Sequence, residues 1–174
     1  DLTQYVDPYI GSGGHGHVFV GANVPYGLVQ LGPSSIPQEW DWTSGYHISD
    51  STVIGFPHMH LSGTGIGDLH DITLMPVTGE VTYARGVESD QTSGLWSYSD
   101  RSKEVVKPGY YATHLMRYGI DVELTATKRV GFHKYTFPQG QDAAVVIDLQ
   151  NGGCWDSPTK AYIKKVDDKT IEGY

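Results

Sequence analysis

The chain has 174 residues, of which 39% are hydrophobic and 18% charged, and its formal net charge is -8. This length and composition are enough to bury the core of one domain. The negative charge argues against a nucleic-acid partner, because phosphate binding requires clustered Lys and Arg. No segment is long and apolar enough to span a bilayer, and no signal-peptide pattern stands at the start.

Residue usage narrows the class further. A single cysteine, Cys154, rules out an internal disulfide and a cysteine-based zinc ribbon. The chain contains 22 Gly, 12 Tyr and 4 Trp. Such a composition is typical of all-β extracellular proteins and carbohydrate binders, since sugars present apolar faces that stack on aromatic rings.

The first third of the chain is rich in loops. Gly and Pro recur too often between residues 1 and 33 for a helix to form. The stretch from Trp40 to Asp71 then gathers two tryptophans, four histidines and four aspartates without any Lys or Arg. That is more polar and aromatic chemistry than packing requires, so this stretch is the first candidate for function.

Short strand patterns follow. Residues 71–75 and 80–83 read as a hairpin divided by Pro76 and Gly79, and 84–107 as a polar surface excursion. Apolar residues alternate along 110–118, 121–127 and 130–137, which predicts three strands. The continuous apolar run 143–149 predicts a strand buried on both faces, and 161–166 with 170–174 predict a further hairpin.

No window shows a capped helical period, so the predicted fold is all-β, a two-sheet antiparallel β-sandwich. The chain stops at Tyr174 inside what reads as a strand. We therefore expect residues 1–174 to be an N-terminal β-sandwich domain that is truncated at its C-terminal end.

Two glycine and histidine motifs have competing interpretations. Gly11–Gly16 matches G-x-G-x-x-G, but no helix pattern follows, so nucleotide binding is disfavoured; a loop whose backbone approaches a ligand and a plain turn stay open. His15/His17 and His58/His60 are i, i+2 pairs that face one way on a strand and so can share a metal. The Glu expected of a cupin site is missing, which favours hydrogen-bonded structural rings.

Trp40 and Trp42 also share one face if their segment is extended. Their polar neighbours make a sugar-stacking edge at least as well supported as core packing. Carboxylates suited to acid–base chemistry are Asp41, Asp50, Asp68 and Asp71. Glycoside hydrolysis needs two carboxyls at a set separation, which spacing does not establish, and turns explain Asp50 and Asp68 equally well.

Several longer motifs occur in a fixed order over nearly the whole chain. They are Asp7–Gly11 with Gly13–His17, Pro25–Leu31, Trp40–Trp42 with Ser44–His47, Ile54–Phe56 with His58 and His60–Gly65, Lys107–Tyr111, Glu123–Thr127 and Arg129–His133. Together they closely resemble the start of the family 92 glycoside hydrolases, the calcium-dependent exo-α-mannosidases. Pro57 stands where the family pattern leads us to expect Ser, a small departure.

The resemblance implies a β-sandwich followed by a helical (α/α)6 barrel, which carries the catalytic carboxylates and most ligands of the calcium ion. It implies inverting hydrolysis of mannose-terminated glycans, as in N-glycan degradation, by an exported protein of the periplasm or cell surface. No catalytic residue and no metal ligand is then expected in this chain, and the fragment alone is expected to be inactive. The substrate-binding positions that match are Ser12, Gly13, Trp40, Trp42, His58 and His60.

One alternative from another class stays open. The same aromatic and histidine residues suit a stand-alone β-sandwich module that binds carbohydrate or a metal. In either case the expected partners are sugars, or the helical domain of the same protein, rather than nucleic acid.

Overall fold

The computed structural model describes residues 1–174 and is all-β. Its helical turns are three short 3-10 helices, η1 (Leu2–Tyr5), η2 (Trp40–Trp42) and η3 (Arg101–Lys103). Every strand pair is antiparallel, which confirms the predicted fold class. No helix is long and apolar enough to cross a membrane.

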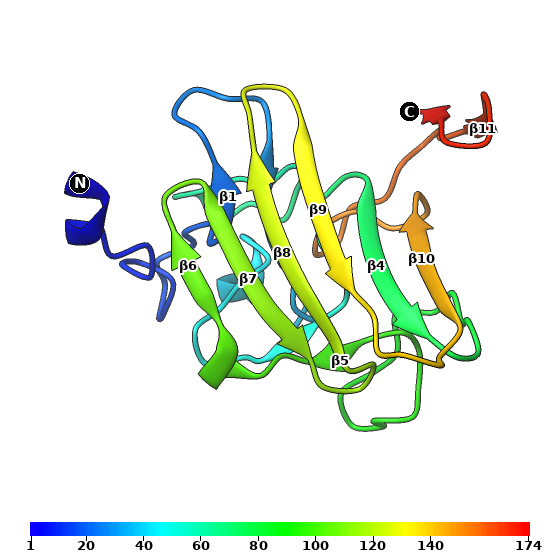
Figure 1. The fold of residues 1–174 in the computed structure, drawn as a ribbon. Coiled ribbons are helices and arrows are strands. Elements are labelled where there is room, and N and C mark those ends of the chain that lie inside the picture. The colour runs from blue at the N-terminus through cyan, green and yellow to red at the C-terminus, as the bar shows by residue number, and fades with distance from the viewer.

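A four-stranded sheet forms the centre of one layer (Figure 1). Its strands, in spatial order, are β6 (Val105–Lys107), β7 (Tyr110–Leu115), β8 (Ile120–Ala126) and β9 (Gly131–Thr136). Burial alternates along β7 and β8, as a half-buried sheet requires. The strands predicted at 110–118, 121–127 and 130–137 are therefore confirmed. Gly119, with φ +64°, makes the tight connection between β7 and β8.

A second pair of strands extends this layer beyond β9 (Figure 1). β4 (Thr73–Thr78) pairs with β10 (Ala143–Asp148), and Pro76 lies opposite Val145 inside the ladder. The predicted hairpin of 71–75 with 80–83 is thus wrong. The first strand continues through Pro76 and finds its partner about seventy residues later, while 80–83 form no strand.

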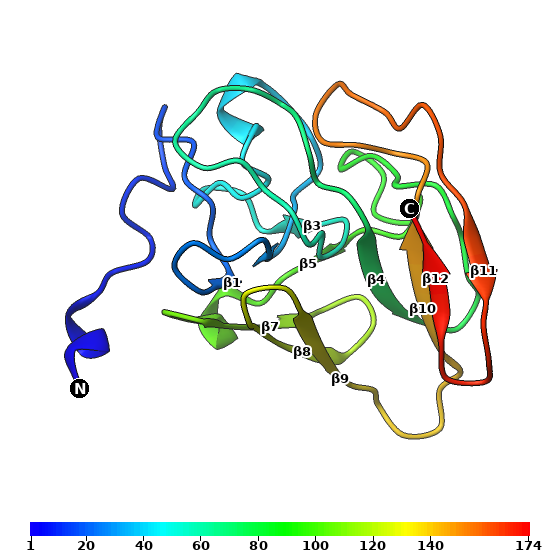
Figure 2. The same cartoon turned by 90° about the horizontal axis from the view of Figure 1, so that it is seen from above.

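The opposite layer consists of loops tied by short ladders (Figure 2). β1 (Ala22–Asn23) pairs with β2 (Gln30–Leu31), and β3 (Thr52–Val53) with β5 (Ser97–Tyr98). The segment 84–107, predicted to be a surface excursion, is partly core, because Leu95 and Trp96 are buried just before β5. The predicted C-terminal hairpin is confirmed as β11 (Ile163–Lys165) and β12 (Ile171–Gly173).

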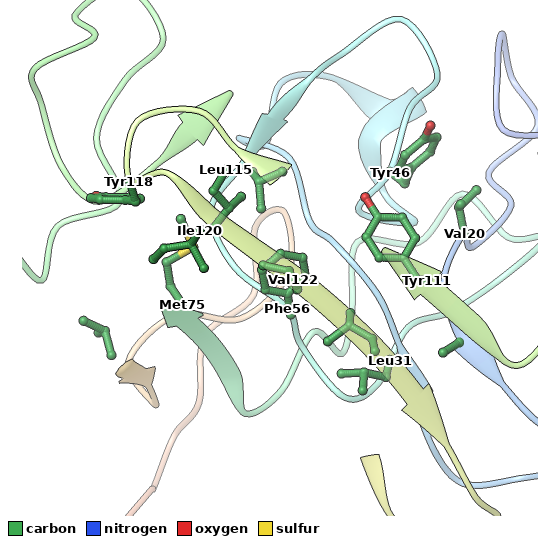
Figure 3. Packing of buried hydrophobic residues seen from close by; sticks show 14 of the residues in the cluster. Val20, Leu31, Tyr46, Phe56, Met75, Tyr111, Leu115, Tyr118, Ile120 and Val122 are labelled. Carbon is green, nitrogen blue, oxygen red and sulfur yellow. The ribbon is translucent and has the colours of Figure 1, made fainter. Parts of the chain in front are cut away.

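The core lies between the two layers (Figure 3). Ile120 and Val122 of β8 face Leu31 and Phe56 of the loop layer. Leu124 of the same strand belongs to this cluster, and all five side chains are almost fully buried. The strand predicted at 143–149 exists, but its burial on both faces is wrong. In β10 only Val146 is buried, because little covers that end of the layer.

Candidate functional site

The stretch from Trp40 to Asp71 lies in the loop layer. Trp40 and Trp42 belong to the 3-10 helix η2, so the extended geometry that would align their side chains is absent. The two rings have separate partners, one beside His17 and the other on His47. Around them gather the residues that we call the aromatic loop cluster. These are Gly13–His17, Trp40–Trp42 and His47.

Trp40 is the exposed aromatic group of this cluster, with 52% of its surface accessible. Its indole N–H donates to the carbonyl of Gly65 at 2.8 Å, and the His17 ring packs against the indole with 4.1 Å between ring centroids and 63° between planes. A Cβ on Gly65 would come within 2.2 Å of the indole nitrogen, so only glycine allows this approach. The ring is thereby held at its edge while part of its surface stays open to solvent.

Asp41 connects Trp40 to the glycine-rich loop, which is the segment Gly11–Gly16. Its Oδ1 lies 2.7 Å from Nδ1 of His15 and 3.3 Å from Nε2 of His17. The hydrogen bond from His15 is the main cause that lowers the pKa of Asp41. Nε2 of the buried His17 is too poorly aligned with that oxygen for a hydrogen bond and has no other partner. The carboxylate is therefore ionised and keeps its second oxygen available.

Trp42 is more firmly packed than Trp40. Its indole N–H donates to Oδ2 of Asp50 at 2.7 Å, and Gln38 donates to the same oxygen. The ring stacks on His47 at 4.4 Å and 18° between planes, and Nε2 of His47 lies 3.3 Å from the carbonyl oxygen of Gly14. Trp42 thus forms a fixed wall between the 47–50 turn and the glycine-rich loop.

The glycine-rich loop is a built turn. Ser12 is buried; its hydroxyl donates to the carbonyl of Tyr9 at 2.7 Å, and its own carbonyl accepts from the amide of Ile48. A Cβ on Gly13 would meet the Ile48 side chain at 3.0 Å. Ser12 therefore stabilises the loop from its buried side, and the loop packs against the 47–50 turn, which contacts Trp42.

His58 and His60 lie apart from the aromatic loop cluster, and their rings do not share a face. Nδ1–H of His58 donates to the carbonyl of Ile72, and its Nε2 lies 3.0 Å from Nε2 of His133. Nδ1 of His133 lies 2.7 Å from the hydroxyl of Tyr135. Both histidines are neutral in this chain of bonds: His133 donates through Nε2 and accepts from Tyr135, and burial lowers the pKa of His58 and brings that of His133 to about 4.

His60 is in the interior. Its Nδ1 lies 2.8 Å from the carbonyl oxygen of Gln30, and its Nε2 lies 3.3 Å from the hydroxyl of Ser34. Burial is the main cause that lowers the pKa of both His60 and its neighbour His70, the latter to about 4. Of the six predicted positions, Ser12, Gly13, Trp40 and Trp42 come together, while His58 and His60 take hydrogen-bonded places elsewhere.

The carboxylates of the central stretch do not form a calcium site. Calcium prefers six to eight oxygen ligands. No group of three or more His, Cys, Asp or Glu side chains has an arrangement that would hold a metal ion. Both oxygens of Asp50 accept N–H groups, and Asp41 is held by histidine, so neither offers such a donor set.

Sequence reasoning missed the support beneath the cluster. The buried carboxylate of Glu104 accepts hydrogen bonds from three tyrosines and an arginine, and Arg101 reaches the turn behind Trp42. The spacing of Arg101 and Glu104 is consistent with an ion pair, but nothing in the sequence connects Glu104 to Tyr9 and Tyr46, which are 95 and 58 residues away.

Comparisons with known proteins agree on one family. The model described as the glycosyl hydrolase family 92 N-terminal domain matches residues 5–174. A solved family GH92 α-mannosidase from Bacteroides thetaiotaomicron, in complex with mannoimidazole, is 38% identical with a TM-score of 0.94; the match covers 99% of this chain and 22% of that chain.

More distant relatives extend the pattern. A family GH92 inverting mannosidase from Bacteroides thetaiotaomicron has the same fold, with a TM-score of 0.71 at 24% identity over 86% of this chain and 20% of that chain. An uncharacterized secreted glycosidase from Arthroderma benhamiae is 28% identical over 162 residues, which are 86% of this chain and 20% of the relative. The chain thus spans about a fifth of the length of these relatives.

Proposed function

Because the chain belongs to glycosyl hydrolase family 92 and matches its N-terminal domain, we propose that residues 1–174 serve a calcium-dependent, inverting exo-α-mannosidase. In this proposal the aromatic loop cluster forms one wall of the mannose pocket. The general acid, the base and the calcium ligands come from a helical domain of the same protein. The hydrolytic step is assigned to that domain, and this chain binds and orients the sugar.

The observation that carries the proposal is the exposed ring of Trp40 beside an ionised Asp41. The Trp40 indole, fixed through its N–H by the Gly65 carbonyl and packed against His17, leaves about half of its surface exposed (52%) for stacking on the apolar side of a pyranose. The second oxygen of Asp41 can accept a sugar hydroxyl, a bond strengthened by the charge. Stacking and a charged acceptor at adjacent residues are the two contacts by which proteins orient a terminal sugar.

Substrate class and location follow the relatives. The solved relative in complex with mannoimidazole supports a terminal mannoside as ligand, and the relative from Arthroderma benhamiae, named a secreted glycosidase, supports export to the periplasm or cell surface. Mannose-terminated N-glycans fit both. His58 and His60, which hydrogen-bond the carbonyls of Ile72 and Gln30 apart from the aromatic loop cluster, are not part of this proposed pocket wall.

The test uses the complete enzyme and a terminal α-mannoside. Trp40→Ala is expected to lower kcat/KM about five- to thirtyfold, because a stacked aromatic contributes about 1 to 2 kcal/mol. Phe132→Ala is the matched control, since Phe132 is 53% exposed on β9, away from the aromatic loop cluster, and it should change kcat/KM less than twofold. Equal effects of the two variants would remove Trp40 from the pocket.

A second arm separates this function from the alternative module. Activity of the complete enzyme should disappear with a calcium chelator and return with added calcium, while the 174-residue chain alone should not release mannose. Turnover by the isolated chain, or tight mannose binding by it without the helical domain, would favour a stand-alone carbohydrate-binding module.

A further inference from the structure

A buried carboxylate lies between the sheet and the loops that carry the aromatic loop cluster. Only 3% of the Glu104 side chain is accessible. Its Oε1 accepts from the hydroxyls of Tyr9 at 3.0 Å and Tyr46 at 2.8 Å, and its Oε2 accepts from the hydroxyl of Tyr111 at 2.8 Å. Nη1 of Arg101 lies 2.8 Å from both oxygens. The carboxylate of Glu104 thus accepts hydrogen bonds from three tyrosines in three different segments and from the nearby Arg101.

Such a group is costly to bury. Removing a carboxylate from water destabilises a fold unless a countercharge and several hydrogen bonds replace the lost hydration. Glu104 has both, and replacing a whole buried charged network of this kind by well-packed apolar residues is often neutral or stabilising. Desolvation and the charge of Glu104 raise the pKa of Tyr46 and Tyr111, so both hydroxyls stay protonated and donate. The arrangement therefore fixes geometry more than it adds stability.

The bonds continue outward to two loops. The guanidinium of Arg101 donates through Nη2 to the carbonyls of Asp50 and His47, the two ends of one turn. It also lies over the Tyr46 ring, 4.5 Å from its centroid. On the other side, the backbone carbonyl of Tyr9 accepts from the amide and the hydroxyl of Ser12. Glu104 and Arg101 thus hold the glycine-rich loop and the 47–50 turn at the same point.

These two loops are the ones that hold Trp42. The carboxylate of Asp50 accepts a hydrogen bond from the Trp42 indole N–H, and His47 stacks on the Trp42 ring. The carbonyl of Ser12 accepts a hydrogen bond from the amide of Ile48. A shift of the 47–50 turn therefore moves both partners of Trp42 and the floor of the glycine-rich loop together. Glu104 itself is enclosed and touches no sugar in any placement on the exposed cluster.

We propose that Glu104 and Arg101 are positioning residues, which hold the glycine-rich loop and Trp42 in the geometry that binds the sugar. The inference rests on the proposed function of the aromatic loop cluster. It predicts a defect in binding rather than in chemistry, because the reacting groups belong to another domain.

The test compares Glu104→Gln with Glu123→Gln in the complete enzyme. The amide keeps the size of Glu104 but loses the charge that Arg101 and three hydroxyls require, so KM for the mannoside should rise about tenfold, the order of one charged hydrogen bond, with kcat within about twofold. Glu123 is the control, since it also accepts from a tyrosine, Tyr110, and a cation, Lys134, but on the exposed face of the sheet. E123Q should leave both constants unchanged.

Two tyrosine variants separate positioning from general stability. Tyr9→Phe cuts the bond between Glu104 and the glycine-rich loop and should raise KM several-fold. Tyr111→Phe removes the bond from β7 to Glu104, which reaches neither loop, and should lower the melting temperature with KM within twofold. If the role of Glu104 is purely structural, KM stays unchanged in every folded variant, Tyr9→Phe included.

The outcomes are distinguishable from failure of the proposed function. If Trp42→Ala raises KM and a folded E104Q does not, the positioning role is overturned while the pocket stands. If neither tryptophan affects kinetics, the pocket assignment itself fails. Should E104Q not fold, Arg101→Lys decides in its place, because a lysine can neutralise Glu104 but cannot also hold both turn carbonyls. An unchanged KM in R101K overturns the proposal.

Discussion

The middle of the sheet layer, at β8, and its end at β10 are built from similar residues but packed differently. On β8, Ile120, Val122 and Leu124 are at most 1% exposed, and the strand has a partner on each side. On β10, Val145 is 42% exposed and Val146 is the single buried residue. Both strands are rich in β-branched residues, so propensity does not separate them. The difference lies in what covers them.

The β4–β10 end of the sheet layer borders a cavity, where the middle of the layer is covered by the loop layer. A cavity of about 270 Å³ lies between β4, β10 and the hairpin β11–β12, lined mainly by apolar side chains and by His58. Every residue of that hairpin's two strands is exposed. The free energy of local opening is therefore expected to vary along the chain. In the β7–β8 region it should approach the free energy of global unfolding, and in the β11–β12 hairpin it should be far lower.

The sharpest test of this comparison is a pair of truncations. Leu124→Ala removes a side chain from the covered middle of the layer and should cost about 3 kcal/mol of unfolding free energy, the transfer of the lost methyls plus the cavity left behind. Ile147→Ala at the β10 end should cost about 1 kcal/mol or less, since its site is already half open. Denaturant titration measures both. Equal losses would mean that the two regions are packed alike.

Acid should lower the unfolding free energy of the chain through its buried histidines, by less for each histidine than the loss expected for Leu124→Ala. Burial lowers the pKa of His58, His60, His70 and His133, the last two to about 4. The unfolded state takes up protons near pH 6.5, while the folded state takes them up only at lower pH, near pH 4 for His70 and His133. Stability is thus full above about pH 6.5 and declines as the pH falls from there towards 4.

His133 provides the specific measurement. Between pH 7 and pH 4.5, the variant His133→Phe should lose about 2 kcal/mol less unfolding free energy than the wild type, because one of the groups that resist protonation is gone. The comparison is of the two pH slopes, so a constant offset from lost bonds does not matter. A slope equal to the wild type would show that His133 is protonated alike in both states.

The sequence predicted the regular part of the fold well. Alternation along β7, β8 and β9 reflects one buried face and one wet face, which a period of two records directly. The partner of β4 was not predictable in the same way. Pro76 suggested a break, yet β4 passes through it, because pairing with a strand about seventy residues away is a long-range choice that local propensity does not encode.

The candidate site was predictable in content and less so in shape. Trp40, Trp42 and the glycine-rich loop stood out by composition and by family resemblance, and the structure brings them together. The i, i+2 argument failed for the tryptophans, since η2 is helical, and for His58 and His60, which lie in irregular backbone. The role of Glu104 depends on two partners that are distant in the sequence, Tyr9 and Tyr46, and only the assembled fold shows it.

The smallest predicted effect concerns two surface ion pairs, and it tests whether charge contributes to the difference in stability between the four-stranded sheet and the β11–β12 hairpin. Lys134 pairs with Glu123 on the well-packed sheet, and Lys164 pairs with Glu172 on the exposed hairpin. Both lysines are largely exposed, so Lys134→Ala and Lys164→Ala should each change the unfolding free energy by about 0.5 kcal/mol or less. A markedly larger loss for Lys134→Ala in denaturant titration would assign part of the contrast to charge. Similar small losses leave burial as its cause, because the strands then differ only in the side chains packed against them.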